Sequence, residues 1–414
     1  MSRPEPTIVL TGDEPAVPFN TLPLHPKVAA AVAESGYTVA TPIQAAAIPP
    51  AVDGRDILGS AQTGTGKTAA FALPILSQLA DDRTKATAGR PRVLVLAPTR
   101  ELAAQIGESF ETYGAQLRLR NVVIFGGVGQ GKQTNALRRG VHTLIATPGR
   151  LLDLIDQGFI DLSELEIFVL DEADRMLDMG FLPAIKQIIG LLPPERQSLF
   201  FSATMPPAII ELTETLLVDP VVIDVIPEER SVDLIDQTVQ FVPKKLKPSR
   251  LYEVLSDDSV KQAVVFTRTK RGANQVAKRL TEDGLPAEAI HGNKSQNART
   301  RTLDAFRDGR LRVLVATDLA ARGLDIEDVS HVVNYELPNE PESYVHRIGR
   351  TGRAGATGQA IAFCDADEKQ FLRDIEKLIG HKVPVVGEDT VGEAPPVKMG
   401  GNKRGRGGRR PRRS

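Results

Sequence analysis

Short apolar runs alternate with helical stretches along most of this chain, and that alternation restricts the possible folds most. In the first half the runs are RVLVLA (92–97), TLIA (143–146), LEIFVL (165–170) and SLFF (198–201). Near-continuous apolar strands separated by helices are typical of a parallel sheet covered on both faces. The pattern therefore predicts a doubly wound α/β architecture.

The alternation occurs twice. It pauses at a polar, acidic stretch with a proline (226–233), then restarts with apolar runs at 263–267, 288–291, 312–317, 331–335 and 359–364. From about residue 387 it stops, and 400–414 is rich in Gly and Arg, a composition typical of disorder. We therefore predict an N-terminal extension (1–18), two α/β domains (19–226 and 234–386), a linker (227–233) and a disordered tail (387–414).

Charge and cysteine content restrict the class of protein and the compartment in which it works. Eight basic residues and no acid lie between Lys398 and Ser414, and the rest of the chain has 43 basic against 52 acidic residues. The single cysteine, Cys364, excludes an intrachain disulfide, and with six scattered histidines it speaks against structural zinc. No apolar run approaches the ~18 residues of a membrane helix. These features indicate a soluble protein of a reducing compartment, with no membrane partner.

The segment AQTGTGKT lies between an apolar pair and a helical run. Glycines at 64 and 66 let the backbone curl around a phosphate chain, Lys67 reaches the outer phosphates, and the Thr68 hydroxyl suits Mg²⁺. The generic P-loop has Gly where this chain has Ala61, and a plain strand-to-helix turn is the alternative. We expect phosphate binding by Ala61, Gln62, Thr63, Gly64, Thr65, Gly66, Lys67 and Thr68.

The segment DEAD (171–174) directly follows an apolar strand. A carboxylate at the end of a parallel strand lies at the edge where doubly wound sheets bind ligands. Asp171 is placed to hold Mg²⁺, and Glu172 to orient or deprotonate an attacking water. Alone, such a segment is more often the solvated start of a helix. The GKT motif about a hundred residues upstream favours a nucleotide site.

With these motifs the chain resembles the DEAD-box RNA helicases, and within them the bacterial RhlE-like group. The resemblance covers about residues 19–385, with the motifs in the family's order. It implies two RecA-like domains, in agreement with the alternation. It also implies ATP and Mg²⁺ as ligands and RNA as the partner.

The resemblance extends the nucleotide site. The family's adenine-reading segment corresponds to GYTVATPIQ (36–44), with Tyr37 and Ala40 where the family often has Phe and Pro. The Gln44 amide suits the edge of adenine and Phe19 offers a stacking face, so we expect ATP over GTP. A capped helix start is compatible with this role. The resemblance implies further nucleotide contacts at Phe19, Tyr37, Thr41, Gln44, Gly323 and Asp325.

Two arginines of HRIGRTGR (346–353) would complete the catalytic set from the second domain. Arg350 and Arg353 are three residues apart and would present guanidinium groups to the γ-phosphate. The alternative is salt bridging on a helix. In this interpretation Lys67 and Glu172 lie on one domain and the arginines on the other. Hydrolysis would then await a closure that requires both ATP and RNA.

The remaining family motifs imply RNA contacts and interdomain coupling. Each alone would more often be a capped helix start or a structural residue. RNA, read through 2′-hydroxyls and phosphates with little sequence preference, is expected at Arg100, Gly126, Gly127, Thr147, Arg150, Thr267, Arg268, Gln296, Arg299 and Thr317. Coupling between the nucleotide and RNA sides is expected at Asp174, Ser202, Thr204 and His346.

Alternatives to a helicase stay open. One is an ATP-gated RNA clamp or annealing factor without productive unwinding, and another is a DNA-directed helicase of the same superfamily. A non-enzymatic RNA scaffold is disfavoured because Lys67, Asp171, Glu172, Arg350 and Arg353 are all present. For this group we expect a cytoplasmic location and ribosomal or RNA-decay complexes as possible partners.

Overall fold

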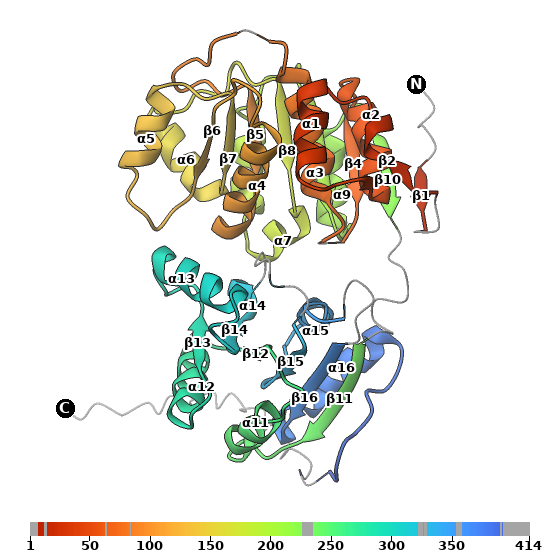
Figure 1. Cartoon of the computed structure of the whole chain (residues 1–414), viewed down its shortest axis with the longest axis vertical. Helices are drawn as coiled ribbons and strands as arrows, with labels where there is room; N and C mark the ends of the chain where they lie inside the picture. Colours follow the sequence, from red (N-terminus) through yellow and green to blue (C-terminus); the bar gives the residue numbers. More distant parts are fainter. Residues whose placement is uncertain are drawn as a thin grey trace, which may run out of the picture.

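The computed structural model describes residues 7–11, 15–62, 64–82, 84–225, 235–321, 326, 329–352, 358–389 and 391. Figure 1 shows two α/β domains, the first (red to yellow-green) above the second (green to blue). Each domain is built on its own parallel sheet, which confirms the predicted doubly wound architecture. The predicted linker (227–233) lies outside the described residues.

Within the described residues, the first domain contains an eight-stranded sheet in which all neighbouring strands are parallel. Its sheet order is β1 (Ile8–Leu10), β10 (Val221–Val225), β4 (Ile57–Ser60), β9 (Gln197–Ser202), β8 (Ile167–Leu170), β5 (Val93–Leu96), β7 (Thr143–Ala146) and β6 (Asn121–Ile124). A short antiparallel ribbon pairs β2 (Val17–Pro18) with β3 (Val39–Ala40).

Helices cover both faces of this sheet, and each face has its own apolar core. Phe71 and Phe110 belong to one core and Leu154 and Ile185 to the other. The first face carries α1 (Pro26–Glu34), α2 (Pro42–Val52), α3 (Lys67–Leu79) and α4 (Arg100–Tyr113), after the 3₁₀ turn η1 (Phe19–Thr21). The second carries α5 (Gly131–Arg138), α6 (Pro148–Asp156), α7 (Ala173–Asp178), α8 (Leu182–Ile189) and α9 (Pro207–Leu216).

The described part of the second domain repeats this plan with six parallel strands. Their sheet order is β11 (Ile235–Phe241), β16 (Gly358–Cys364), β15 (His331–Asn334), β12 (Ala263–Thr267), β14 (Val313–Thr317) and β13 (Ala287–Ile290). The helices are α11 (Lys247–Leu255), α12 (Lys270–Glu282), α13 (Gln296–Arg307), α14 (Asp318–Ala321), α15 (Pro341–Ile348), η2 (Ala366–Glu368) and α16 (Lys369–Ile379).

The domain ends differ from the predicted boundaries. β1, which we assigned to an N-terminal extension, adds a strand to the first sheet beside β10. In the predicted tail, Asp389 accepts a hydrogen bond from Lys369 Nζ (2.7 Å), and Val391 is buried. Both differences arise from contacts with elements distant in sequence. The tail from residue 392 lies outside the described residues.

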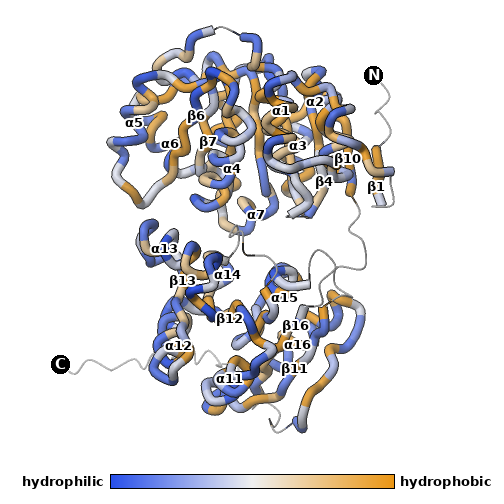
Figure 2. The backbone as a smooth tube through the Cα atoms, viewed as in Figure 1, coloured by the Kyte–Doolittle hydropathy of each residue, from blue (hydrophilic) through white to orange (hydrophobic). Residues whose placement is uncertain are grey.

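The strand interiors are apolar, and polar residues gather where strands end. Figure 2 shows hydrophobic strands inside each domain and hydrophilic segments on the helices and loops. In the described chain no helix has the length and apolar content to cross a bilayer. Because all strands of a sheet run the same way, the segments after β4, β8 and β9 meet at one edge, where the candidate site lies.

Candidate active site

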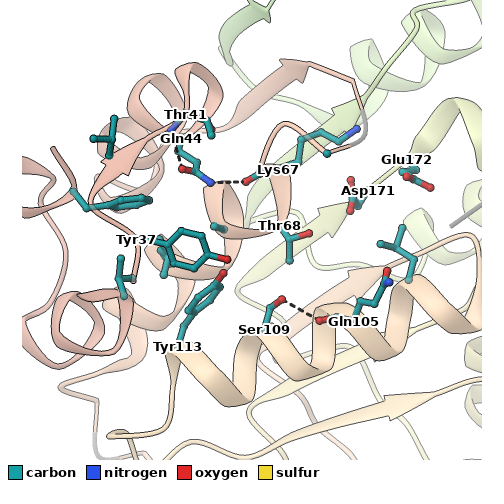
Figure 3. A pocket seen from close by; sticks show the side chains of 18 residues that line it. Tyr37, Thr41, Gln44, Lys67, Thr68, Gln105, Ser109, Tyr113, Asp171 and Glu172 are labelled. Carbon is teal, nitrogen blue, oxygen red and sulfur yellow. Dashed lines mark hydrogen bonds between the residues drawn. The ribbon is translucent and has the colours of Figure 1, made fainter. Parts of the chain in front are cut away.

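A cavity of ≈ 390 Å³ lies at the carboxyl edge of the first sheet. Figure 3 shows Lys67, Thr68, Asp171 and Glu172 at one end and Tyr37 and Tyr113 at the other. The first group carries the charges that suit phosphates, and the second is aromatic. The cavity therefore has the polarity of a site for a nucleoside phosphate.

The phosphate end is shaped by two glycines with positive φ. Gly64 (φ 87°) and Gly66 (φ 89°) form the turn before α3, and Gly66 is the N-cap residue of that helix. A Cβ on Gly66 would collide with the Gln44 side chain. Lys67 is buried and its Nζ donates to the Ala61 carbonyl (2.9 Å). The start of α3, whose first N–H groups have no carbonyl partner inside the helix, thus lines the cavity.

Asp171 is a buried carboxyl group with an unused oxygen. Its Oδ1 has no hydrogen-bond partner among the described residues, and only 2% of the residue is exposed. Burial, reinforced by Glu172 and Asp174 and opposed by Lys67, raises the pKa of Asp171 to about 7. A buried, unsatisfied carboxylate oxygen in a cavity that Thr68 also lines fits a hard cation such as Mg²⁺.

Glu172 connects the two domains electrostatically. It adopts a left-handed backbone conformation (φ 53°, ψ 53°) before α7, and its Oε2 accepts a hydrogen bond from Arg175 Nη1 (2.6 Å). Burial raises the pKa of Glu172, but Arg175, Lys67 and Arg350 outweigh it, so that the pKa is lowered. Arg350 belongs to the second domain, and its charge therefore reaches the catalytic edge of the first.

Arg350 follows a helix that is anchored through Arg347, and its own N–H donates to the Arg347 carbonyl. It lies two residues beyond α15, and 8% of it is exposed. Within α15, Arg347 Nη2 donates to Asp318 Oδ2 (2.7 Å) and its Nη1 to Asn334 Oδ1 (2.8 Å). His346 occupies the same last helical turn. Arg353, Thr63, Gly323 and Asp325, all predicted site residues, lie outside the described residues.

Aromatic side chains form the base end of the cavity. The ring centroids of Phe19 and Tyr37 are 6.2 Å apart, and those of Tyr37 and Tyr113 are 6.4 Å apart. Burial and the hydrogen-bonded Tyr37 raise the pKa of Tyr113. The Gln44 amide is already engaged: its Oε1 accepts from Thr41 N (2.9 Å) and its Nε2 donates to Gly66 O (3.1 Å). The capped helix start and the nucleotide loop are therefore joined through Gln44.

Hydrogen bonds join Asp174, which follows β8, to Ser202 and Thr204 at the end of β9. Asp174 Oδ2 accepts hydrogen bonds from Thr204 N (2.9 Å) and Thr204 Oγ1 (3.0 Å). Ser202 Oγ accepts from Asp174 N (3.2 Å) and donates to Thr204 O (2.8 Å). The expected hydrogen bonds to Asp174 are thus present.

The predicted RNA contacts of the first domain lie at the carboxyl ends of β6 and β7 and the start of α4. Arg100 lies so close to Gly127 (φ 76°) that a Cβ there would collide with the guanidinium group. Arg150 donates to Gln133 Oε1 (3.3 Å), and Thr147 precedes α6. A Cβ on Gly126 would meet open space. Their roles in RNA binding stay predictions.

In the second domain the predicted RNA residues divide into three groups. Thr267 and Thr317 are buried at the ends of β12 and β14. Arg268 interacts instead with its own domain, because its Nη2 lies 3.2 Å from Oε1 of the buried Glu368 and its guanidinium stacks on Phe371. Arg268 is therefore tied to the α16 region in this arrangement.

Gln296 and Arg299 contact the first domain. Gln296 Nε2 donates to Glu101 Oε1 (3.1 Å), and Arg299 Nε lies 3.0 Å from the same oxygen. Glu101 and Arg299 are both buried. Two residues predicted to contact RNA therefore form the contact between α13 and α4.

Sequence reasoning missed the partners of several site residues. These are Glu101, Arg175, Arg347 and Tyr113. Glu101, Arg175 and Arg347 stand inside or beside the motifs, so their spacing offered a signal. Arg175 pairs with Glu172 three residues away, whereas the partners of Glu101 and Arg347 come from distant segments. Tyr113 stands outside every motif, and no sequence pattern marks it.

Two protein-family models match the chain. The model described as DEAD/DEAH box helicase matches residues 41–212, and that described as helicase conserved C-terminal domain matches residues 246–355. The first match contains the phosphate loop, Asp171 and Glu172, and the second contains Gln296, Arg299 and Arg350.

Named relatives and a solved structure extend this likeness over both domains. ATP-dependent RNA helicase DeaD of Mycobacterium tuberculosis is 45% identical over 363 residues, which are 87% of this chain and 63% of the relative, less than two thirds of its length. DEAD-box ATP-dependent RNA helicase CshA of Bacillus subtilis is 42% identical over 91% of this chain and 76% of the relative. Among solved structures, S. cerevisiae Dbp5 bound to RNA and ADP BeF3 gives a TM-score of 0.78 at 32% identity, over 89% of this chain and 95% of that chain.

Proposed function

The chain belongs to the DEAD-box family of ATP-dependent RNA helicases, and from this premise we propose that it is an RNA-stimulated ATPase. Domain closure would open short RNA duplexes or remodel RNA–protein complexes. The observation that carries this proposal is the contact of Gln296 and Arg299 of the second domain with Glu101, which lies on the first-domain helix that also lines the nucleotide cavity. Such a divided site is complete only when the domains are together.

The first domain supplies binding and water activation. Lys67 and the N–H groups at the start of α3 bind the phosphate chain, and Glu172 orients the attacking water and takes up its proton. Asp171 and Thr68 would hold Mg²⁺, which when bound neutralises phosphate charge and polarises the bond to be broken. The aromatic end of the cavity would hold adenine, with Phe19 as a stacking face.

The second domain supplies the charge that completes the site. Arg350 would stabilise negative charge that develops on the transferred phosphoryl group, the role of an arginine finger. The Glu101 contact with Gln296 and Arg299 exists only when the domains meet. RNA that bridges both domains would favour the same arrangement, and by linkage RNA and ATP would each tighten binding of the other.

Membership of the RhlE-like group, a cytoplasmic location and ribosomal or RNA-decay partners are narrower proposals. The first rests on the resemblance of the motifs, and the second on the single cysteine, Cys364, which is buried. The partners follow from the same resemblance. Dbp5 is a relative whose solved structure holds RNA and ADP BeF3, which supports RNA and ATP as ligands here.

The deciding experiment measures ATP hydrolysis by the full chain without nucleic acid, with single-stranded RNA and with single-stranded DNA. We expect strong stimulation by RNA and little by DNA. Equal stimulation by DNA would favour a DNA-directed enzyme, and no stimulation by either would contradict the proposal. Strand displacement on a short RNA duplex then separates a helicase from an ATP-gated clamp, which would hold RNA without displacing a strand.

A further inference from the structure

A buried arginine contacts the carboxylate that we assign as the general base. Arg175 lies in α7, three residues after Glu172, and its Nη1 donates to Glu172 Oε2 (2.6 Å). Only 10% of the Arg175 side chain and 6% of the Glu172 side chain are exposed. An exposed ion pair is weak because water screens it, whereas a pair removed from water attracts strongly and keeps its geometry.

The backbone around this pair is fixed as well. Glu172 has a left-handed conformation (φ 53°), which is uncommon for a residue with a side chain and persists where the surrounding contacts determine it. Its carbonyl accepts a hydrogen bond from Met176 N (3.1 Å). Asp174 accepts from Arg175 N (2.9 Å) and, with its other carboxylate oxygen, from Thr204 N (2.9 Å). The segment that carries Glu172 and Arg175 is therefore tied both to its own helix and to the end of β9.

A fixed carboxylate suits proton transfer from water. A general base must bring an oxygen within about 2.6–3.2 Å of the attacking water. The bond from Arg175 engages Oε2 of Glu172, so the carboxylate cannot rotate without losing it. Its other oxygen then has a defined direction. Misplacement of a reacting group by about 1 Å can lower the rate by about 10²-fold, so this restraint has a kinetic consequence.

Arg175 stands apart from the nucleotide cavity. Figure 3 shows Glu172 beside Asp171 at the phosphate end. Arg175 is not among the described residues that line this cavity. Its effect on the reaction is therefore expected to pass through Glu172 rather than through the nucleotide.

We propose that Arg175 is a positioning residue for hydrolysis, which orients the Glu172 carboxylate toward the attacking water. The proposal rests on the proposed RNA-stimulated function and adds a residue that none of the predicted contacts includes. Arginine suits this role because its planar guanidinium is always charged and its donors have fixed directions. A lysine would supply the charge without the direction.

The test is a double-mutant cycle on Arg175 and Glu172, measured as single-turnover ATP hydrolysis by the full chain at saturating RNA. We expect Arg175→Gln to lower the rate by about 10²-fold. The ATP and RNA concentrations for half-maximal rate should stay nearly unchanged. In the Glu172→Gln background, Arg175→Gln should cause little further loss, because the group that it orients no longer acts as a base. An arginine that only supports the fold would lower the rate by the same factor in both backgrounds.

Two further variants complete the design. Arg175→Lys keeps a positive charge beside Glu172, and we expect its rate to lie between those of the wild type and Arg175→Gln. The matched control is Arg250→Gln, which removes the arginine of an exposed pair with the same spacing, since Arg250 Nη1 lies 2.7 Å from Glu253 Oε2. This control should hydrolyse ATP at the wild-type rate.

Binding of labelled RNA in the presence of a non-hydrolysable ATP analogue shows that each variant is folded. If Arg175→Gln does not fold, the same cycle with Arg175→Lys decides between the same outcomes. Equal losses in both Glu172 backgrounds, or a wild-type rate in the Arg175 variant, would overturn the positioning role. A wild-type chain whose ATPase activity RNA does not stimulate would contradict the proposed function instead, so the two failures are distinguishable.

Discussion

Lys67 shows how burial determines the chemistry of a single residue. Its ammonium group is buried with the neutral Ala61 carbonyl as a hydrogen-bond partner. A buried cation without an equally close anion is costly, and the ammonium has three donors to satisfy. A phosphate entering the cavity would supply the missing negative charge. The same burial leaves Asp171 Oδ1 for a cation.

We predict that Lys67→Ala lowers RNA-stimulated hydrolysis by at least about 100-fold, because backbone N–H groups alone cannot replace the lost charge in the transition state. Steady-state ATPase assays at saturating RNA measure this. The matched control is Lys186→Ala, which removes an exposed lysine paired with Glu211 on the outer helices. Normal turnover by Lys67→Ala would refute the phosphate-loop assignment.

Glu172→Gln should separate binding from hydrolysis. The amide keeps the shape of the side chain and leaves Asp171 intact, but it cannot accept the proton of the attacking water. We expect kcat to fall by roughly 10²–10⁴-fold, the usual contribution of a general base, while ATP and RNA still bind. Labelled RNA should then dissociate slowly in the presence of ATP. Rapid release, as in a Glu211→Gln control, would count against Glu172 as the base.

At the scale of elements, α4 links the two functional sides of the first domain. Arg100 and Glu101 stand at its start, beside the predicted RNA contacts and the second domain. Gln105, Ser109 and Tyr113 of the same helix line the nucleotide cavity. Because a helix is a stiff element, a shift of its first turn toward RNA would reach the cavity wall. α4 therefore offers a physical connection between the predicted RNA contacts and the nucleotide cavity.

We predict that Glu101→Gln weakens the response to RNA. The change leaves the buried Arg299 without its anionic partner, and breaking a buried pair in this way costs about 3–5 kcal/mol. The cost falls on the closed arrangement, so the RNA concentration for half-maximal stimulation should rise at least tenfold. Glu108→Gln, at an exposed position of the same helix, is the control. Equal RNA dependence in both variants would show that the α4–α13 contact does not support closure.

At the scale of the whole molecule, catalysis depends on a residue that the first domain does not contain. We predict that Arg350→Ala leaves ATP binding nearly unchanged and lowers kcat by about 10³-fold or more, as for other arginine fingers. The finger acts on charge that develops in the transition state, so affinity for the ground state changes little. ATP binding and kcat at saturating RNA measure the two effects. An unchanged kcat, as expected of Arg310→Ala, would make Arg350 a structural arginine.

The basic tail, which lies beyond the described residues, would act as a general RNA tether for an otherwise acidic chain. If half of its eight positive charges engage a single strand, a chain ending at Val397 should show a salt slope shallower by about three. The RNA concentration for half-maximal stimulation should rise at low salt, while kcat survives. A lost kcat would place the tail in the active site, and two unchanged constants would make it a solubility feature.

The amino-acid sequence by itself determined many of the inner strands and the chemistry of the phosphate end, whereas β1, β6, β10 and β11 were not among the predicted strands. Apolar runs such as 143–146 and 263–267 form β7 and β12 with the predicted bounds, because a buried parallel strand must be apolar on both faces. The loop before Lys67, the carboxylates after β8 and the Asp174 bridge follow from residues close together in the chain or placed by the parallel strand ends.

Only the tertiary structure decided which distant residues become partners. It joined β1 to β10, tied the Gln44 amide to Gly66 of the phosphate loop, and placed Glu101 against Gln296 and Arg299. It also buried the ring of His291, whose nitrogens have no hydrogen-bond partner in the described part of the chain. The physical reason is that periodicity and motif spacing report on neighbours along the chain. Pairing across hundreds of residues depends instead on how the two sheets and their helices pack.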